Sequence, residues 1–168
     1  IKNWEDEIEL HSFIKVRVLN NDVVNNHEVF CSPARIILMH YQVAKKEKYR
    51  MELFLQSRKV GIILDESQVI KTPDSSLSKT YHYLSDFFPR KLILTGTPIA
   101  NRPYDIWSQI YFLDKGKSLG ESFLEFKNNL DLSNDLHENE IGRNSFIDSL
   151  STINKSIKSF CFRETKET

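Results

Sequence analysis

Features that mark secreted, membrane-spanning or metal-stabilised proteins are scarce in this sequence of 168 residues. Its two cysteines, Cys31 and Cys161, lie far apart and form neither a CxxC pair nor a Cys/His ligand spacing. We therefore expect no disulfide framework and no structural zinc, and a reducing, intracellular compartment. No apolar run approaches the roughly 18 residues that a membrane-spanning helix needs. The opening IKNWEDEIEL has no initiator methionine and no signal-peptide pattern, so we expect a soluble protein and a sequence cut from a longer one.

An excess of charge of one sign is also lacking. Lysine plus arginine and aspartate plus glutamate both total 23, so the formal net charge is zero. This balance argues against a protein that coats nucleic acid by bulk charge, although it leaves room for a local basic face. The length and the 40% hydrophobic content suit one domain with a real core.

Apolar runs alternate with helix-like segments, which is typical of βαβ units and a largely parallel sheet. The run at 60–65 is apolar on both faces, which favours a central, buried strand. The segment 20–28 is rich in asparagine and is interpreted as a loop. The pattern predicts strands at 13–19, 35–41, 60–65 and 91–95, and helices at 42–56, after a cap at Asp74 or Ser75, and at 102–114.

The sequence changes character after residue 114. Segment 115–160 contains helix-like pieces and no buried strand, and its stretch 131–140 is acidic with little apolar content. We expect a helical protrusion with an exposed acidic loop, and aromatic side chains that form a small core. A poorly ordered insertion is the alternative interpretation.

Polar residues follow two apolar strands that plausibly neighbour each other. Asp65 ends the strand at 60–65 and Glu66 follows it, while Thr95 ends the strand at 91–95 and Gly96 and Thr97 follow it. Ligands of open α/β sheets bind beyond the carboxyl ends of strands. One carboxylate there is a suitable ligand for Mg²⁺, and a neighbouring one can accept a proton from an attacking water. The alternative is that Asp65 and Glu66 only end a strand and cap a turn.

Five blocks in order carry a resemblance to a known family. DESQVIK (65–71), LTGTPIAN (94–101) and DIWSQIYFLD (105–114) resemble motifs of the Swi/Snf family of DNA-translocating ATPases, a branch of the superfamily 2 helicases. The leading NWEDE is similar to the family's segment after motif Ia. The final FCFRETK is similar to its exit segment from the first lobe. The resemblance implies a partial RecA-like fold of the P-loop NTPase type: an α/β parallel sheet with flanking helices and a C-terminal helical protrusion.

The resemblance implies a domain plan and roles for single residues. Residues 1–114 would form an incomplete first RecA-like lobe, and 115–168 the protrusion and exit segment of that lobe. Asp65 would hold Mg²⁺ with Glu66 nearby, and Glu66 would be the catalytic base for ATP hydrolysis. Gln68 would sense the nucleotide, and Thr95, Gly96 and Thr97 would couple hydrolysis to movement between lobes. Thr97 would act through hydroxyl contacts, and Gly96 by allowing a backbone turn that is closed to residues with a Cβ. The alternatives are that Gln68 is a surface amide and that Lys71 is simply solvated.

Parts of the family's pattern are missing or altered. A phosphate-binding GxxxxGK[ST] loop is absent, since the partial match at Gly116–Lys117–Ser118 has Tyr111 where the first glycine belongs. The upstream phosphate-loop segment and a second RecA-like lobe would then be required partners. Glu164 replaces a second arginine of the exit segment. Double-stranded DNA is the implied partner, and its candidate contacts are Lys45, Lys46, Lys71, Arg163 and Lys166, although a lysine-rich helix is often only a solvated face.

Three functions can be compared. The first is a piece of an ATP-dependent DNA translocase that is inactive in isolation, located in the cytoplasm of a bacterium or virus-infected cell or in a eukaryotic nucleus. The second is a non-catalytic scaffold with the same fold, which the intact DESQ and TGTP blocks disfavour. The third is a metal-dependent nuclease using Asp65 and Glu66, which is disfavoured because the neighbouring strand end offers hydroxyls rather than further metal ligands.

Overall fold

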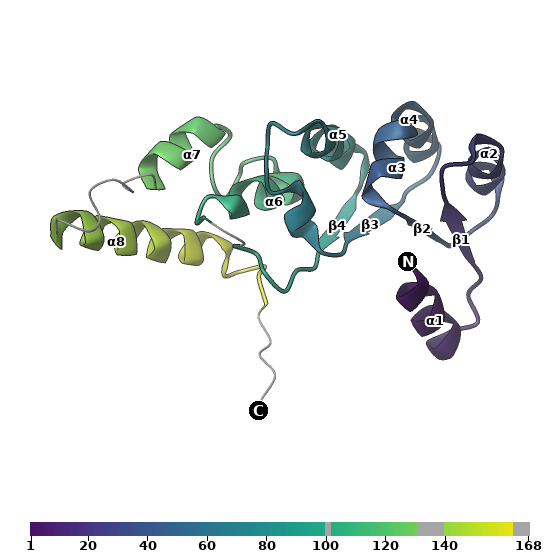
Figure 1. Cartoon of the computed structure of the whole chain (residues 1–168), viewed down its shortest axis with the longest axis horizontal. Coiled ribbons are helices and arrows are strands. Elements are labelled where there is room, and N and C mark those ends of the chain that lie inside the picture. Colours follow the sequence, from purple (N-terminus) through teal and green to yellow (C-terminus); the bar gives the residue numbers. More distant parts are fainter. Residues whose placement is uncertain (100–101, 131–139, 163–168) are drawn as a thin grey trace. The chain divides into compact units, whose positions relative to one another are not determined.

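The computed structural model describes residues 1–99, 102–130 and 140–162. The chain divides into two compact units, residues 1–62 with 79–90 and residues 63–78 with those from 91 onward. Strands β3 (Gly61–Leu64) and β4 (Arg90–Ile93) and helix α5 (Ser76–Leu84) each cross this division. Strands alternate with helices along the first ninety residues (Figure 1), as the predicted α/β class requires.

Unit 1 is built on a two-stranded parallel sheet. Strand β1 (Val16–Leu19) pairs with β2 (Ile36–Met39) from Val16 opposite Ile36 to Leu19 opposite Met39. Leu19, Val29 and Val43 form its buried cluster, with Ile37 and Met39 packed against them. The helices of this unit are α1 (Lys2–His11), α2 (Val23–Cys31), α3 (Tyr41–Lys46) and α4 (Lys48–Ser57).

The predicted loop at 20–28 is wrong, because α2 occupies most of it. The Asp22 carboxylate accepts hydrogen bonds from the backbone N–H groups of Val24 (2.9 Å) and Asn25 (3.3 Å), which caps the helix. Asn26 is 1% exposed, donates to the Asn20 carbonyl and accepts from the Asn20 N–H. The asparagines therefore stabilise a helix start rather than an irregular loop.

The helix predicted at 42–56 is interrupted at Glu47, which ends α3 and precedes α4. Glu47 is 8% exposed, and its carboxylate accepts a 2.9 Å hydrogen bond from Asn26. Its second oxygen lies 3.3 Å from the Arg50 guanidinium. A buried carboxylate held on both oxygens fixes the chain at this break and links α2 to the α3–α4 pair.

Strands β3 and β4 are neighbours in a second sheet. Gly61 lies beside Arg90, and the Leu94 N–H donates to the Leu64 carbonyl, so the two strands run in the same direction. Burial along β3 alternates: Ile62 and Leu64 are buried, whereas Ile63 is 56% exposed. The predicted burial of both faces is therefore not observed.

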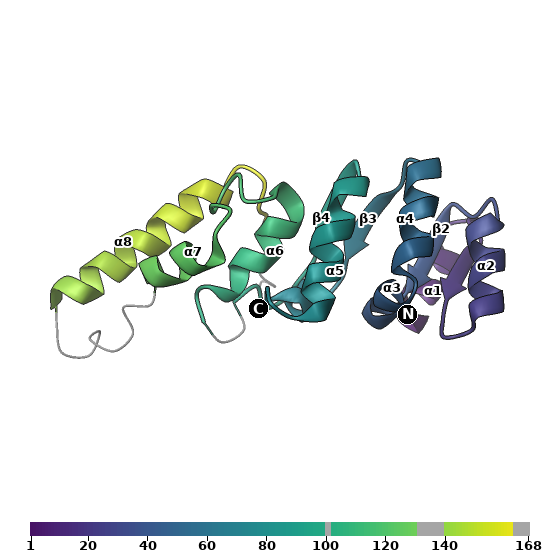
Figure 2. The same ribbon diagram turned by 90° about the horizontal axis from the view of Figure 1, so that it is seen from above.

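Three helices pack together in unit 2, namely α6 (Asp105–Asp114), α7 (Phe123–Leu130) and α8 (Glu140–Ile157) (Figure 2). Trp107 and Ile110 of α6 share a buried cluster with Phe126 and Ile157. The aromatic residues after 114 thus form a core, as predicted, but they share it with α6. The described part of 115–160 contains no strand, as expected. Apart from Glu140, the acidic loop predicted at 131–140 lies outside the described residues, and the domain boundary at 114 stays a prediction.

The helix expected after Asp74 or Ser75 is α5. Ser75 is its cap, because the Ser75 hydroxyl accepts a 3.0 Å hydrogen bond from the Ser78 N–H. Among the described residues, no helix combines the length and apolarity needed to cross a membrane.

Candidate active site

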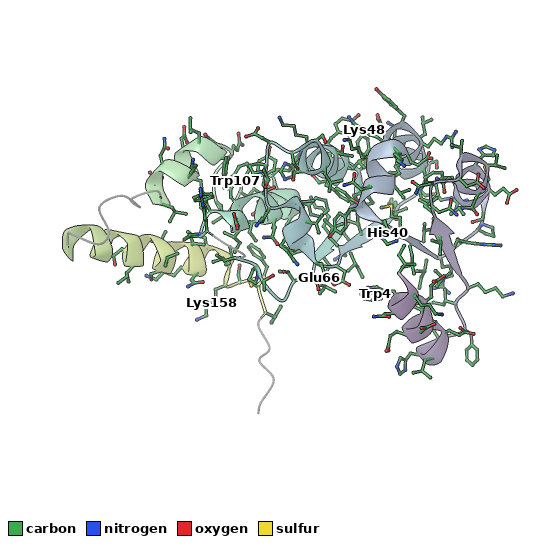
Figure 3. The ribbon with its side chains drawn as sticks, viewed as in Figure 1. Trp4, His40, Lys48, Glu66, Trp107 and Lys158 are labelled. Carbon is green, nitrogen blue, oxygen red and sulfur yellow. The ribbon has the colours of Figure 1, made fainter. Side chains whose placement is uncertain are left out.

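The chain turns sharply where β3 ends. Glu66 has φ 52° and ψ 51°, in the left-handed region, and it leads into the short 3-10 helix η1 (Ser67–Ile70). The Asp65 carboxylate accepts a 3.0 Å hydrogen bond from the Glu66 N–H, which supports the turn. A left-handed residue with a side chain costs roughly 1–2 kcal/mol, and such strain persists where the surroundings impose it. Both carboxylates are exposed beyond the strand end, where Figure 3 labels Glu66.

A chain of hydrogen bonds joins this turn to the residues after β4. The Gln68 Nε2 donates to the Glu66 carboxylate at 2.8 Å, and the Thr95 hydroxyl donates to Gln68 Oε1 at 2.6 Å. The Thr97 N–H then donates to the Thr95 hydroxyl oxygen at 3.1 Å. We call these four residues the relay. Gln68 is therefore not a simple surface amide, since both ends of its side chain are held.

The main chain also ties the two strand ends together. The Ser67 N–H donates to the Leu94 carbonyl at 3.0 Å, directly after the Leu94 bond to Leu64. Glycine is not demanded at position 96, because its φ is outside the left-handed region and an added Cβ would meet no atom within 4 Å. The expected steric reason for Gly96 is thus wrong, and its coupling role stays a prediction.

Helix α6 supplies contacts that the motifs alone did not identify. The buried Ser67 hydroxyl donates to Gln109 Oε1 at 2.7 Å, and the Ser108 hydroxyl donates to the Ile70 carbonyl. The Ile70 carbonyl also accepts from the Ser78 hydroxyl at 3.0 Å. The signal in the sequence was the pair Ser108–Gln109 within the otherwise apolar IWSQIYFL, since buried polar side chains need partners.

The candidate DNA contacts lie in different places. Lys45 and Lys46 are exposed on α3, and the Lys46 ammonium donates to the Asn21 side chain at 2.7 Å. Lys71 Nζ lies 3.5 Å from the Asp105 carboxylate and its side chain is 28% exposed, so it is not simply solvated. Arg163 and Lys166 lie outside the described residues.

The donor set at the β3 end fits a magnesium site in which the substrate supplies some of the metal ligands. Mg²⁺ takes one or two protein carboxylates and completes its shell with water and phosphate oxygens. Asp65 and Glu66 offer such oxygens on adjacent residues at an exposed strand end. The described residues contain no group of three or more His, Cys, Asp or Glu side chains placed for a metal.

Comparisons with known proteins agree on one family. The family model for the SNF2-related domain matches residues 1–168. A SWI/SNF-related matrix-associated actin-dependent regulator of chromatin subfamily A-like protein 1 from Drosophila melanogaster is 30% identical over 113 residues, covering 67% of this chain and 14% of that protein. A probable chromatin-remodeling complex ATPase chain from Oryza sativa is 32% identical over 117 residues, covering 66% of this chain and 10% of the relative.

A solved structure of the same family is similar to this chain over its whole length. The Sulfolobus solfataricus SWI2/SNF2 ATPase core in complex with dsDNA superposes with a TM-score of 0.74 at 26% identity. The match covers 100% of this chain and 32% of that one.

Proposed function

This chain belongs to the SNF2-related domain family, as its motifs predicted, and from that membership we propose that it forms part of an ATP-dependent double-stranded-DNA translocase. The remodelling of chromatin or of other protein–DNA complexes is the proposed task. The α/β structure matches the RecA-like fold of the SNF2 ATPase core, so the fold expected from the resemblance is confirmed. Within the parent protein, this chain would supply the DESQ hydrolysis motif and the TGTP coupling motif.

The relay is the observation that carries the proposal. Glu66 Oε2 accepts a hydrogen bond from Gln68, and Gln68 in turn accepts one from Thr95. A base that removes a proton from an attacking water must be held in a fixed direction. The Gln68 amide holds the Glu66 carboxylate and responds to Thr95 at the same time, because an amide both donates and accepts. A shift of the TGTP segment is therefore transmitted to the base.

The two adjacent acids divide the work. Asp65 would hold Mg²⁺, which would neutralise charge on the phosphate oxygens of ATP when bound. Glu66 would accept the proton of the water that attacks the terminal phosphate. The chain leaves the extended conformation at Glu66, so the two neighbouring side chains need not follow strand alternation and can serve different partners.

The length of the relatives supports a role within a larger protein, because this chain spans 14% and 10% of the two relatives named above. We propose that the phosphate-binding loop and a second RecA-like lobe come from elsewhere in the parent, and that the isolated chain hydrolyses no ATP above background. Lys45, Lys46, Lys71, Arg163 and Lys166 are the proposed contacts to DNA phosphates. The proposed location is the nucleus in a eukaryote, or the cytoplasm in a bacterium or virus-infected cell.

Phosphate release by the full-length parent, measured with and without double-stranded DNA, tests the proposal. We expect Glu66→Gln to lower the DNA-stimulated rate by about a hundredfold or more while ATP still binds. The matched control is Glu125→Gln, which changes an exposed carboxylate of α7 in the same way and should retain the rate. A wild-type parent without hydrolysis would favour the scaffold alternative, whereas a fully active Glu66→Gln variant would refute Glu66 as the catalytic base.

A further inference from the structure

We propose that Gln109 of α6 is a positioning residue that sets the distance between the DESQ turn and the TGTP segment. This inference rests on the proposed function, because it concerns how the same hydrolytic site is held. Gln109 belongs to neither motif. It is 1% exposed, and Trp107, labelled on α6 in Figure 3, lies two residues before it.

The Gln109 amide is used at both ends. Its Oε1 accepts the hydrogen bond of the Ser67 hydroxyl at 2.7 Å. Its Nε2 donates to the Pro98 carbonyl at 2.8 Å and to the Asp105 carbonyl, one turn earlier in α6, at 3.2 Å. One planar group therefore spans the two segments and is itself fixed to its helix. We call this connection the bracket.

The bracket reaches the neighbours of the reacting groups. Ser67 lies between Glu66 and Gln68 in the sequence, and Pro98 directly follows Thr97. The relay thus joins the two segments through partly exposed side chains, whereas the bracket runs from the buried Ser67 and Gln109 to the exposed Pro98. Ser67 is 0% exposed, so water cannot replace its hydrogen bond when the bracket is removed.

An amide is the group that this place requires. Leucine has a similar volume but can neither accept from the Ser67 hydroxyl nor donate to the Pro98 carbonyl. With leucine at 109, the buried Ser67 hydroxyl loses its partner, and the Pro98 carbonyl at the exposed end turns to water, so the link between the two segments is lost. A displacement of about 1 Å is enough to slow a reaction that depends on aligned groups.

Ser108 provides a matched control on the same helix. It is 0% exposed and donates to the Ile70 carbonyl, so it also ties α6 to the DESQ segment. Its hydrogen bond to the Ile70 carbonyl ends in the DESQ segment. The Ile70 carbonyl keeps the Ser78 hydroxyl when Ser108 is changed.

The test compares Gln109→Leu, Ser67→Ala, their double variant and Ser108→Ala in the full-length parent. We expect Gln109→Leu to lower kcat about tenfold or more, with the KM for ATP and the number of bound fluorescent ATP analogues per protein unchanged within about twofold. The double variant should be no slower than Gln109→Leu, because both substitutions remove the same link. Ser108→Ala should retain kcat within about twofold.

Hydrogen exchange provides a readout that needs no hydrolysis. Gln109→Leu should speed exchange in peptides covering 94–99, whereas Ser108→Ala should leave those peptides unchanged. If the wild-type parent hydrolyses ATP and Gln109→Leu leaves kcat unchanged, the positioning role is rejected while the proposed function stands. The positioning role is also rejected if kcat falls only in proportion to the number of nucleotide-binding sites lost. A wild-type parent without hydrolysis would instead reject the proposed function.

Discussion

Replacing Thr95 with valine should uncouple the two strand ends while preserving the shape of the side chain. The Thr95 hydroxyl donates to Gln68 at 2.6 Å and accepts from the Thr97 N–H at 3.1 Å, and valine loses both hydrogen bonds. Each bond contributes about 0.5–1.5 kcal/mol, or about 1–3 kcal/mol in all. If the relay is needed in the transition state, kcat falls by about 5- to 150-fold.

Steady-state ATP hydrolysis by the full-length parent measures this effect. Thr95→Ser is the matched control, because serine keeps the hydroxyl and should retain kcat within about threefold. Gln68→Leu breaks the same connection from its other side. The double variant should therefore fall no more than about twofold below the slower single variant.

The relay would be refuted by a double variant whose loss of kcat equals the product of the two single losses. If Thr95→Val and Gln68→Leu each lower kcat and the double variant shows the product of both effects, the two side chains act independently. The relay would then be a set of separate contacts rather than one path from the TGTP segment to Glu66.

Two further predictions concern unit 1. Asp22→Ala should remove the cap of α2, lower its local stability by about 1 kcal/mol and speed hydrogen exchange at Val24 and Asn25, whereas Asp22→Asn should keep both. Burial raises the pKa of Tyr81 above its ordinary value near 10, so its contribution to stability is complete below about pH 10 and is lost as the pH rises further. Tyr81→Phe should flatten this alkaline decline in the thermal midpoint, and an unchanged decline would contradict the assignment.

The strand ends could be predicted from the sequence because apolar runs stop abruptly at charged or hydroxyl residues. Asp65 and Thr95 both follow such runs. In the structure the two strand ends are joined by the hydrogen bond from the Ser67 N–H to the Leu94 carbonyl. The hydrophobic pattern was sufficient here because burial decides where a strand ends. It overstated the burial of Ile63, since three or four apolar residues in a row do not reveal which face is covered.

Helix α2 and the bracket could not be predicted by the same reasoning. Asparagine disfavours a helix interior on propensity, yet Asn26 is buried and satisfied by Asn20 and Glu47. The role proposed for Gln109 depends on Ser67, which lies 42 positions away in the chain, and on the Pro98 carbonyl. Polar pairs of this kind depend on tertiary geometry, which periodicity does not contain.

The left-handed torsion at Glu66 is sterically best suited to glycine, whereas the proposed chemistry needs a carboxylate at this position. Glycine adopts φ 52° without steric penalty, so Glu66→Gly would relax the turn while deleting the carboxylate. A branched residue such as valine would strain the turn and also remove the carboxylate. If Glu66 has the proposed role, a single codon change to glycine would silence hydrolysis in a domain that keeps its architecture.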